Sequence, residues 1–70
     1  MAADWRDRVP AARAQARESG AAVYIVATLQ GHAVTATQPP AARRHFRVSP
    51  DGAVDINDGL HEPHYQAARV

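Results

Sequence analysis

Two histidines near the C-terminus have the spacing that comes closest to a metal site. His61 and His64 lie three residues apart in the stretch DGLHEPHY, and a site of imidazoles and carboxylates could add a nearby acidic residue or the more distant His45. Pro63 falls between the two histidines, however, and the residue before a proline favours extended backbone. The helical spacing that would bring both rings to one side is therefore lost. We expect no metal site and no cofactor.

The other polar residues lack the spacing of a catalytic group. Ser19 and Ser49 fall at a predicted helix end and a predicted turn, where hydroxyls bond to nearby backbone, and neither stands in a Gly-x-Ser-x-Gly motif. The four glycines are spread along the chain and form no phosphate loop. A chain of 70 residues also leaves little room for a pocket of roughly 300 Å³ or more. We expect a protein that is not an enzyme.

The arginines form two candidate anion-binding patches. All eight basic residues are arginine, whose planar guanidinium suits carboxylates and phosphates. One patch is predicted on a helix face and the other around the third strand; they comprise Arg6, Arg13 and Arg17, and Arg43, Arg44 and Arg47. The net charge is only +1 and aromatic residues make up 6% of the chain, a faint footprint for a nucleic-acid binder. Contact with nucleic acid is therefore the alternative interpretation.

The composition predicts one small domain with a thin core, residues 1–70. A chain this short buries only roughly 60% of the surface that its unfolded form exposes. Half of its apolar residues are alanine, and Leu, Ile, Val and Phe together number 12 of 70. Such domains normally need a disulfide, a metal or a second subunit, and there is no cysteine. We expect the chain to bind another protein or a second copy of itself.

The sequence contains no targeting or membrane-spanning signal that we can identify. No apolar run is long enough to cross a bilayer. The N-terminal stretch MAADWRDRVP lacks the basic start and apolar core of a signal peptide. We expect a cytoplasmic protein with no membrane contact.

The N-terminal segment predicts a helix over residues 8–19. Apolar residues recur at spacings of four, three and four between Trp5 and Ala16, which places them on one stripe. Pro10 falls in the first turn, where proline is tolerated, and Gly20 is a natural stop. We expect Trp5 to fold back on this helix.

Residues 21–38 predict a β-hairpin that turns at Gln30-Gly31 or at Gly31-His32. Strand alternation gives it two distinct faces. The core face carries Val23, Ile25, Ala27, Leu29, Val34 and Ala36. A single helix covers only one face of a sheet, so the other face is expected to be the contact surface for a partner. Its candidate binding residues are Tyr24, Val26, Thr35 and Thr37.

A second hairpin is predicted around the turn Ser-Pro-Asp-Gly, with Gly52 at positive φ. It pairs Phe46 with Ile56 and Arg47 with Asp55. Pro39 and Pro40 mark a connector that carries the chain to a new edge of the sheet, and a terminal helical turn is expected over 63–69. The predicted architecture is α+β: an N-terminal helix packed on a four-stranded antiparallel sheet of two β-hairpins, followed by a short C-terminal tail.

These observations favour a small non-enzymatic protein–protein interaction module. Its mode of action would be that of a regulator or inhibitor of a larger protein, such as the small inhibitors that phages encode, or that of a homodimer. The alternative is a nucleic-acid-binding accessory domain that uses the arginine patches. Retention on heparin that falls steeply with salt would distinguish the second from the first.

Overall fold

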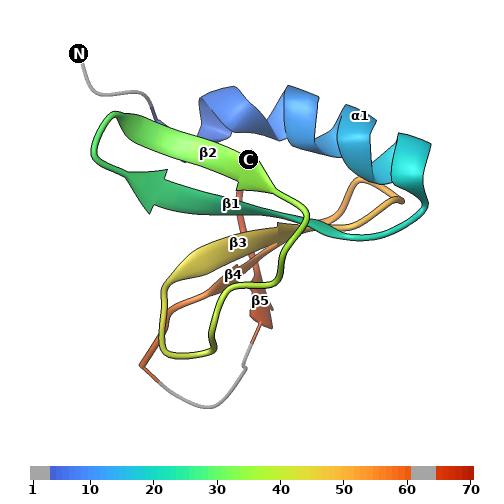
Figure 1. Ribbon diagram of the computed structural model, residues 1–70. Coiled ribbons are helices and arrows are strands. Elements are labelled where there is room, and N and C mark those ends of the chain that lie inside the picture. The colour runs from blue at the N-terminus through green and yellow to red at the C-terminus, as the bar shows by residue number, and fades with distance from the viewer. Residues whose placement is uncertain (1–3, 61–64) are drawn as a thin grey trace.

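The computed structural model describes residues 4–60 and 65–70 (Figure 1). A 3-10 turn, η1 (Trp5–Arg8), leads into the helix α1 (Val9–Ser19). The strands that follow are β1 (Val23–Thr28), β2 (Gly31–Thr35), β3 (His45–Val48), β4 (Val54–Asn57) and β5 (Tyr65–Ala67). All neighbouring strands pair antiparallel, in the order β2-β1-β3-β4-β5. The predicted α+β class is confirmed.

The helix α1 forms almost where the apolar spacing predicts it. Pro10 lies in its first turn, and Gly20 adopts the left-handed conformation (φ 71°) and donates its N–H to the Ala16 carbonyl at 2.9 Å. Trp5, expected to fold back on the helix, belongs to η1 and stacks on the ring of Phe46 with 4.1 Å between the ring centroids. In the part of the chain that the structure describes, no helix is long and apolar enough to cross a bilayer.

The core lies between α1 and one face of the sheet. Alanines on the inner side of α1 let the helix backbone approach the strands closely, since they have almost no side chain to accommodate. Phe46 is the one aromatic ring among the buried core residues that the structure describes. The buried set consists of Val9, Ala12, Ala16, Val23, Ile25, Phe46, Val48 and Val54.

The first hairpin turns earlier than expected. Thr28 pairs with Gly31, so the turn consists of Leu29 and Gln30, and both predicted turn positions are wrong. Gly31 is not in the turn but opens β2 with a φ of 132°. The register differs from the prediction by an even number of residues, so the assignment of β1 and β2 residues to faces still holds. Leu29 itself is fully exposed, not on the core face.

The second hairpin follows the prediction. Phe46 pairs with Ile56, and Arg47 pairs with Asp55. Gly52 has a φ of 94° and donates its N–H to the Ser49 carbonyl at 2.9 Å. The Nε of Arg13 donates to the Gly52 carbonyl at 3.0 Å, which ties the helix to this turn.

The C-terminal segment forms a fifth strand, which corrects the predicted four-stranded sheet and helical turn. Asn57 pairs with Tyr65 and Asp55 with Ala67, so β5 covers what would otherwise be the exposed edge of β4. A strand of three residues is too short for its period to be read from the sequence. The two histidines that were weighed as metal ligands, and the proline between them, lie outside the described residues, so the expectation of no metal site there stays a prediction.

The connection between β2 and β3 crosses the sheet on the face opposite α1. β2 and β3 both pair with β1 from opposite sides, so residues 36–44 must pass over β1, as Figure 1 shows. Pro39 is buried, and the Asn57 side-chain amide donates to the Ala41 carbonyl at 2.9 Å. The proline connector thus reaches a new strand position, as expected, and covers part of the second face.

Candidate binding site

In the part of the chain that the structure describes, no segment covers one end of the helix-facing side of the sheet. The pairings of Val26 with His45 and of His45 with Asn57 place the Leu29–Gln30 turn, the start of β3 and the end of β4 at the same end of the sheet. We call this the hairpin end. Among residues 4–60 and 65–70, coverage of the core face ends at Trp5, which stacks on Phe46. The sheet continues beyond it toward the hairpin end.

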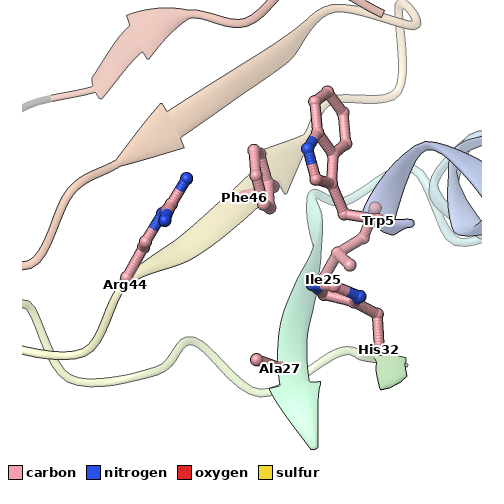
Figure 2. Close-up of a pocket in the computed structure, with 6 residues that line it drawn as sticks. All are labelled: Trp5, Ile25, Ala27, His32, Arg44 and Phe46. Atoms are coloured by element: carbon pink, nitrogen blue, oxygen red, sulfur yellow. The ribbon is translucent and has the colours of Figure 1, made fainter. Parts of the chain in front are cut away.

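A pocket of about 260 Å³ opens where this coverage stops. Ile25 and Phe46 are buried and form its apolar floor, whereas Arg44 is exposed at its rim. Figure 2 shows Arg44 and Trp5 on opposite sides of Phe46 in this view, with His32 below Ile25. The lining residues are Trp5, Ile25, Ala27, His32, Arg44 and Phe46.

Three arginines lie near this pocket, and two of them are engaged with backbone. Arg43 Nη2 donates to the Ala27 carbonyl at 2.9 Å, and Arg8 Nε donates to the His32 carbonyl at 2.9 Å. Within residues 4–60 and 65–70, no hydrogen bond or ion pair engages the Arg44 guanidinium. Arg44 is therefore the cation that this site leaves available to an anion.

The Trp5 indole lies between two other groups. Phe46 stacks at 4.1 Å between centroids, and the Arg6 guanidinium carbon lies 4.5 Å from the centroid of the indole. Groups this close cannot share one face, so they occupy opposite faces and leave only the edge of the ring to the pocket. Arg6 also donates to the Asp4 carboxylate at 3.0 Å, and this hydrogen bond lowers the pKa of Asp4.

The predicted arginine patches are arranged differently from the expectation. Arg6 lies in η1, not in α1, so the helical spacing that grouped it with Arg13 and Arg17 does not apply. Arg13 is held by the second hairpin turn. Arg47 bonds to Asp55 at 3.2 Å and lies 3.9 Å from the ring centroid of Tyr65. Phosphate contact by these residues stays a prediction, with Arg44 the best placed of the six.

The four residues predicted to contact a partner lie on the expected face but differ in exposure. Tyr24 and Thr35 are half-buried and Thr37 is exposed. Val26 is only 9% exposed, because the crossing segment 36–44 covers this part of the face. The expectation that Val26 is an exposed contact residue is therefore corrected. A role in binding for the other three stays a prediction.

A buried polar cluster occupies the centre of this second face. His45 is 1% exposed, with Nδ1 2.7 Å from the Arg43 carbonyl and Nε2 2.7 Å from the Tyr65 hydroxyl. A carbonyl only accepts, so Nδ1 of His45 donates to it, and in the neutral form of the ring Nε2 accepts from the Tyr65 hydroxyl. His45 thus links β3, β5 and the crossing segment. From the sequence, His45 was named only as a distant candidate metal ligand, and this buried role was not anticipated.

The cluster is not fully satisfied. Asn57 is completely buried and uses its amide nitrogen on the Ala41 carbonyl, but its Oδ1 has no partner among the described residues. The same holds for Nε of Arg47. Buried polar groups without partners lower the net contribution of such a network. The remaining hydrogen bonds of His45 are correspondingly important.

We expect Tyr65→Phe to destabilise the chain by about 1–3 kcal/mol, because it leaves the buried His45 Nε2 without its donor. Urea unfolding followed by far-UV circular dichroism measures this. Tyr24→Phe is the matched control: it removes a hydroxyl that makes no hydrogen bond to described residues, and a change within about 0.5 kcal/mol is expected. Equal effects of the two changes would contradict the anchoring role.

The described residues contain no group of three or more His, Asp or Glu that could hold a metal ion. No family model, no curated protein and no solved structure matches the chain. Fold and site together define a small α+β domain with an antiparallel sheet and a pocket at its hairpin end. Its function must be inferred from its own geometry.

Proposed function

We propose that the chain is a non-enzymatic interaction module that binds a partner protein through its hairpin end. The observation that carries this proposal is the position of its exposed apolar residues. Among the described residues, the two most exposed large hydrophobic side chains are Leu29 (106%) and Leu60 (80%). Both lie at the hairpin end, one on the β1–β2 turn and the other three residues beyond β4.

Grouped apolar residues indicate an interaction site more strongly than scattered ones do. The β1–β2 turn and the end of β4 are two to three strand positions apart, or about 10–15 Å at the usual strand spacing of about 4.8 Å. The pocket and Arg44 lie at the same end of the sheet. Arginine and aromatic residues are enriched at protein interfaces, which supports a protein partner there.

The chain also holds the two leucines in defined positions. Leu29 lies on a two-residue turn in which the Thr28 hydroxyl accepts the Gln30 N–H at 3.3 Å. The Leu60 N–H donates to the Asp58 carboxylate at 2.9 Å. A surface ordered before binding loses less conformational entropy when it binds. This favours recognition by a preformed surface.

The test compares the wild type with a Leu29→Ser, Leu60→Ser double variant. Proteins from a lysate of the source organism that bind the immobilised wild type are identified, and their binding is remeasured with purified components. We expect the double variant to bind such a partner at least about tenfold more weakly, a loss of about 1.4 kcal/mol. Both exchanges are at exposed positions, so the circular dichroism melting curve should not change.

Val70→Ser is the matched control. Val70 is also exposed (56%), but β5 runs antiparallel to β4, which places its C-terminal end away from the hairpin end. We expect this variant to bind like the wild type. If the double variant binds the purified partner as tightly as the wild type does, the proposal is wrong.

Nucleic-acid binding has less support as a function. Both faces of Trp5 are occupied, and Arg47 lies over the Tyr65 ring, so these rings offer bases little stacking surface. A homodimer would use the same hairpin end, and sedimentation at increasing concentration distinguishes it from a different partner. A module of this kind would regulate or inhibit the protein that it binds.

A further inference from the structure

We propose that the pocket at the hairpin end binds the C-terminal residue of a partner protein, with an apolar side chain on the pocket floor and the free α-carboxylate on Arg44. This inference rests on the proposed function, because it takes the partner to be a protein. It goes further in assigning the chemistry of the recognised group. It also gives a role to the one pocket-lining arginine.

The volume of the pocket limits what it can hold. At about 260 Å³ it lies below the roughly 300–1,000 Å³ of sites that enclose drug-sized ligands. It therefore fits a single side chain with its backbone end better than a nucleotide. Ile25, Ala27 and Phe46 make the floor largely apolar, which matches an aliphatic or aromatic group.

The positive charge of Arg44 at the rim of the pocket favours a ligand that carries an anionic group next to its apolar side chain. Arg44 has no hydrogen-bond or ion-pair partner in the described parts of the chain, and a guanidinium binds a carboxylate through two parallel hydrogen bonds. Arg44 comes directly before β3 and stands two residues before Phe46, so extended backbone places their Cα atoms about 6.6 Å apart. The cationic and apolar parts of the site are therefore close neighbours along the chain, and both line the pocket.

A chain terminus meets both requirements with one residue. Its apolar side chain and its carboxylate are attached to the same Cα atom, so they fit a floor and a cation that lie this close together. An internal acidic segment would have to supply its carboxylate and its apolar side chain from two different residues. The single available guanidinium also matches a single carboxylate.

The test uses Trp5, the only tryptophan of the chain, whose indole lines the pocket. Its fluorescence is followed while the protein is titrated with N-acetylleucine or with N-acetylleucinamide, which has the same shape but no charge. We expect saturable binding of the acid, about tenfold or more tighter than that of the amide, as charge-assisted hydrogen bonds imply. No saturable change with the acid would overturn the inference.

Variants locate the carboxylate. Arg44→Gln should reduce the preference for the acid to less than about twofold, and Arg44→Lys, which keeps the charge but not the planar fork, should give an intermediate value. Arg17→Gln is the matched control, since Arg17 is an exposed arginine on α1, and it should behave like the wild type. An unchanged preference in both Arg44 variants would overturn the assignment.

Two further probes separate other sources of the signal. N-acetylaspartyl-leucinamide carries its carboxylate on a side chain and has no free C-terminus, so binding as tight as that of N-acetylleucine would overturn the terminal assignment. Acetate has a carboxylate but no large apolar side chain. If it bound as tightly as N-acetylleucine, the apolar floor would not contribute to binding, and the inference would be overturned. Failure of these titrations leaves the Leu29 and Leu60 result unaffected, so the proposed function and this inference can fail separately.

Discussion

Phe46→Ala is expected to remove a large share of the free energy of unfolding of the chain. Phe46 is 4% exposed and stacks on Trp5. Truncating a buried phenylalanine to alanine costs about 3–5 kcal/mol. At roughly 0.05–0.15 kcal/mol per residue, a chain of 70 residues has a total stability of about 4–10 kcal/mol. A single side chain therefore accounts for a large share of it.

Urea unfolding monitored by far-UV circular dichroism measures the loss, independently of any change at Trp5. Leu29→Ala is the control, because it also removes a large apolar side chain, but one that is fully exposed. Its stability should stay within about 0.5 kcal/mol of the wild type. A Phe46→Ala variant with the wild-type unfolding midpoint would contradict the position of Phe46 at the centre of the core.

The second large effect is expected for Gly59→Ala. Gly59 has a φ of +77°, and a Cβ atom there would lie 2.8 Å from both the Ala42 carbonyl oxygen and the Arg44 amide nitrogen. Alanine would meet two penalties: about 1–2 kcal/mol for the left-handed conformation and a clash with backbone that must move. The segment displaced is the one that leads into Arg44, so binding at the pocket should weaken as well.

Gly20→Ala isolates the second penalty. Gly20 has nearly the same φ, +71°, but a Cβ there would meet nothing within 4 Å. We therefore expect Gly59→Ala to be more destabilising than Gly20→Ala by about 1–3 kcal/mol, the usual cost of overpacking. Denaturation midpoints of the two variants measure the difference. Equal midpoints would show that the backbone of residues 42–44 can move away from the added Cβ atom at no measurable cost in stability.

Local patterns predicted much of the fold, and tertiary contacts account for what they missed. The spacing from Trp5 to Ala16, with Gly20 after it, predicted the helix, and the turn at Gly52 set the register of β3 and β4. The strand β5 has no such signal, because it is defined by its pairing with β4 and by the hydrogen bond from Tyr65 to His45. Neither is encoded within a short window of sequence.

The candidate site was less accessible to sequence reasoning than the fold. Arg44 could be named as one of six anion-binding candidates. The pocket could not be predicted, because its lining comes from η1, three strands and the residue before β3, which only the tertiary fold brings together. Likewise, strand alternation put Val26 on the second face correctly. Its burial depends on the path of residues 36–44, which alternation does not predict. The exposure of Leu29 follows from its position in the β1–β2 turn. The turn predicted from the sequence lies later, at Gln30-Gly31 or Gly31-His32, and so left Leu29 in the strand.

The contact between Arg8 and the carbonyl of His32 also bears on how the protein behaves at high concentration. β2 is an edge strand, and in an antiparallel pair alternate residues direct their backbone groups outward. Since the His32 carbonyl meets Arg8 from outside, His32 and Val34 are the β2 residues that face this open edge. A strand of a second copy that paired with β2 would need the His32 carbonyl as an acceptor, and Arg8 already occupies it. Charged side chains at an edge strand limit edge-to-edge aggregation in this way. Arg8 thereby protects part of the open edge of β2 against pairing with another strand.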